Sequence, residues 1–319
     1  MNHDCAILLV NLGSPEKPEP SCVKKYLRQF LSDPRIIETP HLYQKCAWQL
    51  LLNGIILNVR SKKSAQKYRS IWFENESPLL FYTRQITEKL QEKSNIYIDF
   101  AMRYGAPSIG QKLCQLQQKG FHKIVVVPLF AQYSATTIGS IMDEVARYFL
   151  SVRHQPKIRA LYGWFDNEHY IQALMQTMQT HALPRDILVS FHGIPQQYSD
   201  AGDPYFKQCQ KTFELLQNQL PEHHLHFGFQ SRFGPAKWLE PYTFDLLEQL
   251  PQNHIENLAV LCPGFSTDCL ETLEEIAMMG KKIFLENGGK NFVYLPALNA
   301  QNCWIESLWK MIQQELNNF

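Results

Sequence analysis

The chain lacks the paired cysteines that mark zinc sites and dithiol redox centres. None of its eight cysteines belongs to a C-x-x-C pair, and both kinds of site are therefore excluded. The amino terminus also lacks the basic region, long apolar stretch and cleavage site of a secretory signal. Reduced thiols without a signal predict a cytoplasmic protein. The thiols are Cys5, Cys22, Cys46, Cys114, Cys209, Cys262, Cys269 and Cys303.

Long hydrophobic runs are absent too. A membrane-spanning helix needs about 18 consecutive apolar residues, whereas Asn53 and Gly54 interrupt the run over residues 50–57. The wider segment 42–59 fits either ordinary core packing or an apolar face laid on a membrane, and we favour core packing. We expect at most a peripheral contact with the inner face of a membrane.

Neither sign of charge is in excess, and two common enzyme motifs are missing. Lys plus Arg total 31 against 30 Asp plus Glu, which gives no general attraction to nucleic acid. No G-x-S-x-G sequence surrounds Ser190, and Gly288 and Gly289 lack the rest of a P-loop. The hydrolase and nucleotide-binding interpretations therefore lose support. Because the net charge is close to zero, we expect any ligand to bind at a local site. We also expect the protein to be a monomer.

Short apolar runs alternate with longer segments of helical character along the 319 residues. Strands too buried to alternate polar and apolar residues are typical of parallel sheets covered by helices on both faces. We predict two similar Rossmann-like, doubly wound α/β domains over residues 1–162 and 163–319, with a last helix that packs across both. The predicted strands are 6–10, 96–102, 124–130 and 157–161, then 187–191, 225–230, 257–261 and 292–295.

Polar motifs follow several of these predicted strands. Ligands of open parallel sheets collect at the carboxyl ends of the strands, near the point where the strand order reverses. We therefore expect a ligand site there, formed from residues 11–15, 132–137, 192, 230–232 and 263–265.

His192 directly follows a predicted buried strand. Its imidazole suits proton transfer or metal binding, but a packed, hydrogen-bonded histidine explains the position as well. Gly193 permits a close approach and Pro195 stiffens the exit. Both interpretations stay open on residue chemistry alone.

An acidic segment follows another predicted strand. Asp268 and Glu271 have the spacing of a capping box. Glu271 and Glu275 would lie one turn apart on a helix, opposite a face formed by Leu270, Leu273 and Ala277. Their repulsion would raise the proton affinity of one carboxylate, although a solvated acidic face is the alternative.

Five motifs in order resemble the ferrochelatase family, and the resemblance covers nearly the whole chain. The Cys-Pro-Gly-Phe and Asp-Cys-Leu-Glu-Thr-Leu-Glu-Glu forms resemble its proteobacterial branch. The motifs are residues 9–15, 132–134, 190–195, 230–239 and 262–275.

The resemblance implies insertion of Fe²⁺ into protoporphyrin IX, which yields protoheme (heme b) and two protons in the last step of heme biosynthesis. Fe²⁺ is then a substrate, and no tightly bound cofactor is expected. An iron-sulfur cluster is not expected either, because the tail offers only Cys303. The alternatives are a chelatase for cobalt, nickel or coproporphyrin, and a noncatalytic heme or porphyrin carrier.

The resemblance also assigns residues. His192 and Glu271 match the catalytic pair, these two and Glu275 match metal-contacting positions, and Asp268 supports them. Porphyrin-pocket positions, which include a lip segment in the N-terminal domain, match Leu12, Arg60, Tyr68, Ser77, Arg103 and Trp238. Packing, helix capping or ion pairing would explain each of these six as well.

Two positions depart from the better-known family pattern. Cys269 stands where histidine is frequent, and Phe130 replaces a tyrosine of some relatives. A Cys269 thiolate could bind a soft metal, but we favour a small packed thiol at a helix start.

Overall fold

The computed structural model describes residues 4–38 and 41–319, which divide into two compact units. The N-terminal unit contains the chain up to Leu129, Ala135–Tyr162 and Ile312–Phe319. The C-terminal unit contains Phe130–Ser134 and Gly163–Met311. Each unit is built around its own sheet.

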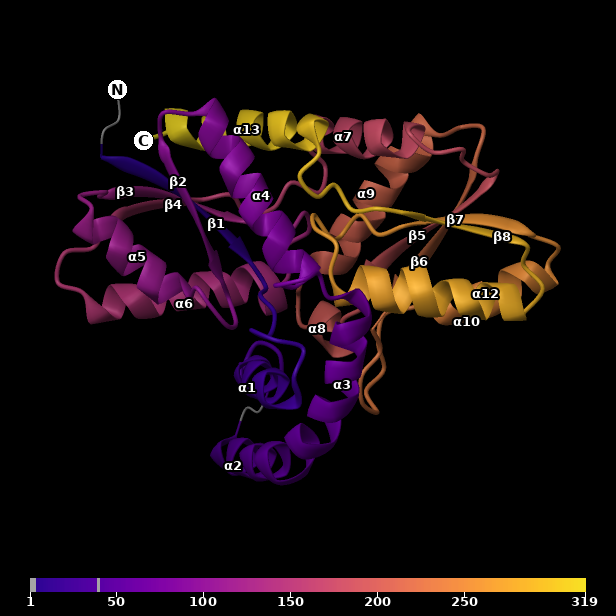
Figure 1. The fold of residues 1–319 in the computed structure, drawn as a ribbon, viewed down its shortest axis with the longest axis horizontal. Coiled ribbons are helices and arrows are strands. Elements are labelled where there is room, and N and C mark those ends of the chain that lie inside the picture. Colours follow the sequence, from indigo (N-terminus) through magenta and orange to yellow (C-terminus); the bar gives the residue numbers. More distant parts are fainter. Residues whose placement is uncertain (1–3, 39–40) are drawn as a thin grey trace. The chain divides into compact units, whose positions relative to one another are not determined.

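The sheet of the N-terminal unit is parallel and has the strand order β2-β1-β3-β4. All of β1 is buried, which explains its unbroken apolar sequence. The strands are β1 (Cys5–Asn11), β2 (Tyr97–Met102), β3 (Lys123–Pro128) and β4 (Lys157–Ala160). The helices are α1 (Pro20–Leu31), α2 (Leu42–Leu51), the π-helix η1 (Leu52–Ile56), α3 (Leu57–Ile71), α4 (Pro78–Lys93), α5 (Ile109–Gln118), the π-helix η2 (Ala135–Gly139) and α6 (Ser140–Ser151) (Figure 1).

The C-terminal unit repeats this topology, with the parallel order β6-β5-β7-β8. The strands are β5 (Asp186–His192), β6 (His224–Gln230), β7 (Asn257–Leu261) and β8 (Asn291–Leu295). The helices are α7 (Glu168–Gln179), α8 (Gln196–Asp200), α9 (Tyr205–Gln219), α10 (Thr243–Gln252), α11 (Leu270–Thr272), the π-helix η3 (Leu273–Gly280) and α12 (Lys281–Glu286). The last helix, α13 (Asn302–Asn317), has residues in both units. The predicted fold class is confirmed, and the strand order reverses between β1 and β3 and between β5 and β7.

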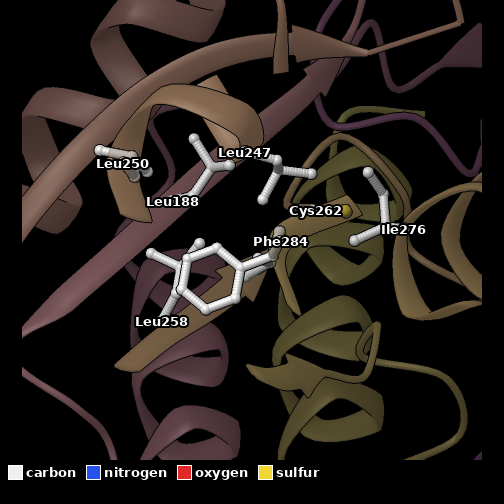
Figure 2. Close-up of a cluster of buried hydrophobic side chains, with 8 residues drawn as sticks. Leu188, Leu247, Leu250, Leu258, Cys262, Ile276 and Phe284 are labelled. Carbon is white, nitrogen blue, oxygen red and sulfur yellow. The ribbon is translucent and has the colours of Figure 1, made fainter. Parts of the chain in front are cut away.

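A buried cluster in the C-terminal unit fixes the helices that follow β7. Figure 2 shows Leu188 and Leu258 of the sheet facing Leu247 of α10 and Phe284 of α12. Ile276 of the π-helix η3 belongs to the same cluster. Full burial of one such side chain stabilises the fold by about 1.5–3 kcal/mol, so the acidic segment 268–275 is carried by a well-packed element.

The prediction that the segment 42–59 packs in the core is wrong, because most of its side chains are exposed. Helix α2 has no buried residue, and only Leu52 and Leu57 of the segment are buried. A π-helix has a wider turn than an α-helix, so η1 changes which side chains face outward. The exposed apolar side chains, here named the apolar helix surface, are Leu42, Tyr43, Leu50, Leu51, Ile55 and Val59. In the part of the chain that the structure describes, no helix is long and apolar enough to cross a bilayer.

Candidate active site

His192 is the last residue of β5 and is half-buried. Its Nδ1 lies 2.7 Å from the carbonyl oxygen of Gly193. Because a carbonyl only accepts hydrogen bonds, Nδ1 carries the proton and Nε2 keeps the lone pair in the neutral ring. A Cβ atom at position 193 would lie 3.2 Å from the Trp238 ring, so glycine lets this segment pack closely. The imidazole is therefore held as a base whose free nitrogen is Nε2.

The end of β6 joins the strand of His192 to the acidic segment. Gln230 pairs with His192 in the sheet register, and its side-chain amide donates to the Glu271 carbonyl at 2.7 Å. The Ser231 hydroxyl donates to the Glu275 carboxylate at 2.7 Å. The fold thus connects the elements that carry the predicted catalytic histidine and both predicted glutamates.

The helix of the acidic segment is wound differently from the prediction. It begins as α11 and continues as the π-helix η3, in which hydrogen bonds run to the fifth residue instead of the fourth. Its buried residues are Thr272, Ile276 and Gly280, whereas Leu270, Leu273 and Ala277 of the predicted face are half-buried. Glu271 and Glu275 are half-buried. π-Helical turns recur at functional sites.

Asp268 is buried and anchors the loop before α11. Its carboxylate accepts hydrogen bonds from Thr272 Oγ1 at 2.9 Å, from Asn299 Nδ2 at 2.7 Å and from the Tyr294 hydroxyl. Burial raises the pKa of Tyr294 well above its usual value, so this hydroxyl stays protonated and can donate. The predicted Asp268–Glu271 capping box is wrong, because Cys269 is the N-cap of α11 and its amide donates to Thr272 Oγ1 at 2.9 Å, which makes Thr272 the second partner.

Sequence reasoning missed Tyr294 and Asn299, and no local signal marks them. They follow Asp268 by 26 and 31 residues, and only the register of β8 and the turn after it bring them to the carboxylate. Asp268, which was predicted as a supporting residue, therefore holds the backbone at the start of the acidic segment.

Cys269 lies between Asp268 and Glu271 and is buried. Burial, and then the neighbouring Glu271 carboxylate, raise its pKa well above that of an ordinary thiol. The thiol is therefore protonated at neutral pH, whereas metal binding needs the thiolate. This supports the packed thiol of the sequence analysis.

Three of the porphyrin-pocket candidates have structural partners in the N-terminal unit. Ser77 caps α4 by accepting from the Leu80 amide at 3.2 Å. Arg103 donates to the Asp33 carboxylate at 2.5 Å. Tyr68 is buried, with its ring edge-on to another tyrosine.

The remaining porphyrin-pocket candidates are Leu12, Arg60 and Trp238. Leu12 and Arg60 are half-buried in the N-terminal unit, and burial lowers the pKa of the Arg60 guanidinium. Trp238 is buried in the C-terminal unit, where its indole donates to the Phe233 carbonyl at 2.9 Å. Within residues 4–38 and 41–319, no three His, Cys, Asp or Glu side chains are grouped so that they could hold a metal ion.

A groove of about 710 Å³ lies at the amino-terminal ends of the strands in the C-terminal sheet. Asp186, Asn257 and Asn291, the first residues of β5, β7 and β8, line it. It is separate from His192, which ends β5.

Comparison with known proteins places the chain in one family. A model of the ferrochelatase family matches residues 4–316. A ferrochelatase of Francisella tularensis subsp. tularensis (strain WY96-3418) is 45% identical over 323 residues, covering 98% of this chain and 96% of that protein. The ferrochelatase of F. tularensis subsp. novicida (strain U112) is 44% identical over the same shares of both chains.

Solved chelatase structures share the fold. SirB from Bacillus subtilis with Fe³⁺ has a TM-score of 0.61 at 11% identity, covering 99% of this chain and 96% of that one. The sirohydrochlorin chelatase SirB from B. subtilis subspecies spizizenii in complex with cobalt has a TM-score of 0.58 at 12% identity, with the same coverage. The structural likeness carries the fold alone, whereas the sequence matches extend over almost the entire chain, and by them the chain belongs to the ferrochelatase family.

Proposed function

We propose that His192 is the base of the ferrochelatase reaction in this chain. The reaction inserts Fe²⁺ into protoporphyrin IX, releases the two pyrrole protons and gives protoheme, the last step of heme biosynthesis. The observation that carries the proposal is the hydrogen bond from His192 Nδ1 to the Gly193 carbonyl, which leaves Nε2 to accept a proton. Each N–H bond of the porphyrin breaks as a nitrogen lone pair becomes available to the metal.

Glu271 and Glu275 supply negative charge and hard oxygen ligands for the incoming Fe²⁺, or pass protons on. The half-buried positions of Glu271 in α11 and of Glu275 in the π-helix η3 support this role, since a carboxylate that keeps some water can exchange an ion. The Ser231 hydroxyl orients the Glu275 carboxylate. Fe²⁺ is in this proposal a substrate that passes through.

The porphyrin contacts apolar groups that bend it, and bending exposes the nitrogen lone pairs. Strain of this kind uses binding energy to approach the transition state. Trp238 is the candidate wall in the C-terminal unit, because its ring lies against Gly193, next to His192. Leu12 and Arg60, which are half-buried, are the candidates in the N-terminal unit. We also propose that the chain works as a monomer without an iron-sulfur cluster.

Anaerobic incubation with Fe²⁺ and protoporphyrin IX, followed by absorbance, tests the proposal. His192→Ala should slow heme formation about 10³-fold and change porphyrin affinity, measured by fluorescence, less than threefold. The matched control His224→Ala alters an exposed histidine of the same unit and should leave the rate unchanged. A His192→Ala rate within tenfold of the parent rate would refute the base.

The parent protein itself separates the alternatives. Porphyrin binding without metallation would favour a carrier. Faster insertion of Co²⁺ or Ni²⁺, or preference for coproporphyrin, would favour another chelatase.

We further propose that the apolar helix surface rests on an anionic membrane. Leu42 and Leu50 are each 78% exposed and Ile55 is 62% exposed, and the exposed Lys45 and Lys62 lie in the same helices. Apolar and basic side chains on neighbouring turns are the composition of helices that lie in the plane of a bilayer.

Vesicle co-sedimentation tests the membrane contact. The double variant Leu50→Asn, Ile55→Asn should lose binding to phosphatidylglycerol vesicles at least tenfold. Leu150→Asn is the control, because Leu150 is 89% exposed on α6 and outside the apolar helix surface. Equal binding of both variants would reject the contact without affecting the assignment of His192.

A further inference from the structure

Gln230 touches both halves of the candidate active site. Its backbone carbonyl accepts the Gly193 amide at 2.7 Å, directly beside His192. Its side-chain Nε2 donates to the Glu271 carbonyl at 2.7 Å. The residue is only 2% exposed. One buried residue therefore fixes the strand end of the base and the backbone of the principal glutamate.

The orientation of the Gln230 amide is determined by its partners. Its Oε1 accepts from the Ser190 hydroxyl at 2.9 Å and from the Cys262 thiol at 3.3 Å. The Glu271 carbonyl can only accept, so the atom that faces it must be the NH₂ group. A polar group in this buried position is costly unless every partner is present, and here both ends of the amide are satisfied.

The bond falls where the helix changes its winding. Glu271 lies in α11, and the π-helix η3 begins two residues later, at Leu273. A change from α to π winding disturbs the regular series of backbone hydrogen bonds. The Gln230 amide provides a donor to a carbonyl next to this change, which ties the direction of the Glu271 side chain to β6.

We propose that Gln230 is a positioning residue that sets the place of Glu271 relative to His192. This rests on the proposed function of those two residues. Gln230 itself touches no reacting atom, and it acts through Glu271.

Gln230→Met tests the inference, since methionine keeps the length of the side chain and removes the donor. We expect kcat for iron insertion to fall about tenfold, as when an outer partner of a metal ligand is removed, with little change in KM for protoporphyrin. The control Ser190→Ala removes a donor to Oε1 but keeps the bond to Glu271, and it should lower kcat no more than about twofold.

A double-mutant cycle excludes a merely structural effect. If Gln230 acts through Glu271, Gln230→Met should cost less than about twofold in a Glu271→Gln background, whereas general loosening of the fold would be additive. An unchanged kcat in Gln230→Met, or full additivity, would overturn the inference. His192→Ala reports separately on the proposed function, so inactivity of that variant beside a normal Gln230→Met rejects positioning alone.

Discussion

The two sheets have the same strand order, but the charged side chains at the carboxyl ends of their strands have different surroundings. We call these carboxyl ends the carboxyl edge of each sheet. In the N-terminal unit, Arg103 follows β2 and forms a buried ion pair with Asp33, which Tyr104 and Ser140 also contact. In the C-terminal unit, Ser231 follows the equivalent strand, β6, and donates to the Glu275 carboxylate.

The strand-end residues of the first strands differ in the same manner. Asn11 of β1 donates to Thr83 and accepts from the Leu12 amide, whereas His192 of β5 keeps Nε2 as a lone pair. The topology places polar groups at the carboxyl edge of both sheets. In the N-terminal unit these groups bond to one another, and we interpret that edge as structural. In the proposed function, the half-buried His192, Glu271 and Glu275 at the end of the C-terminal sheet exchange protons and metal.

We expect the largest effect from substitution of Asp33 in the N-terminal unit. Asp33→Asn removes the nearer and more deeply buried counter-charge of the Arg103 guanidinium, which keeps Glu144 at 3.7 Å. Removing one partner of a buried pair costs up to about 3–5 kcal/mol of unfolding free energy. Urea denaturation measures this loss. The control Asp143→Asn removes a largely exposed partner of Arg35 and should cost less than about 1 kcal/mol. Equal losses would contradict a structural role for the N-terminal edge.

The pH dependence of this effect has a defined sign. Burial opposes ionisation of Asp33, but hydrogen bonds from Ser140, the Arg35 amide and Tyr104, together with the Arg103 charge, hold its pKa below the usual value of 3.8. A lowered pKa gives stability above the unfolded pKa, and this stability disappears as the pH falls through the folded pKa. The difference between parent and Asp33→Asn should therefore narrow below about pH 4.

For Glu271→Gln we expect the opposite result to Asp33→Asn, namely a large loss of activity and a small change in stability. Loss of the carboxylate charge should slow iron insertion about 10²-fold, while the free energy of unfolding changes by less than about 1 kcal/mol because the side chain is half-buried. Steady-state kinetics and urea denaturation on the same preparation measure both. Glu286→Gln, an exposed change on α12, should alter neither. A normal rate in Glu271→Gln would move the chemistry away from this edge.

Ser231 tests whether a hydroxyl orients the second glutamate. Ser231→Ala should lower kcat about fivefold, because a hydrogen bond to a charged group is lost. Ser231 has a φ of 112°, a conformation that glycine adopts without strain. Ser231→Gly should therefore lower kcat equally while being more stable than the alanine variant. Recovery of kcat in the glycine variant would assign the effect to the backbone.

The fold could be read from the sequence because buried parallel strands are continuous apolar runs. The prediction for β7 matches the structure at both ends, and the other strands differ by one or two residues. The failures have other causes. The apolar residues of α2 were assigned to a core because pattern alone does not show whether a face is covered. In the π-helix η3, Ile276 packs in one cluster with residues of α10 and α12, and such tertiary contacts are not contained in local propensity.

The candidate active-site residues show the same division. His192 and Glu271 could be proposed because each sits beside a recognisable strand end and motif. Gln230 stood in a motif as well, but its bond to the Glu271 carbonyl depends on the pairing of β5 with β6. Tyr294 and Asn299 reach Asp268 only through the complete sheet.

The smallest expected effect concerns Cys269, where substitution distinguishes a packed side chain from a metal ligand in the candidate active site. Cys269→Ala should leave KM for Fe²⁺ within about twofold of the parent, because burial and the Glu271 charge keep the thiol protonated. It should cost about 1 kcal/mol of stability, as removal of a small buried group does. Cys209→Ala, at a buried thiol of α9 whose pKa is also raised by burial, is the matched control. A tenfold rise in KM for Fe²⁺ confined to Cys269→Ala would make this sulfur part of the metal route, and the contrast between the two edges would then extend to a third ligand beside the two glutamates.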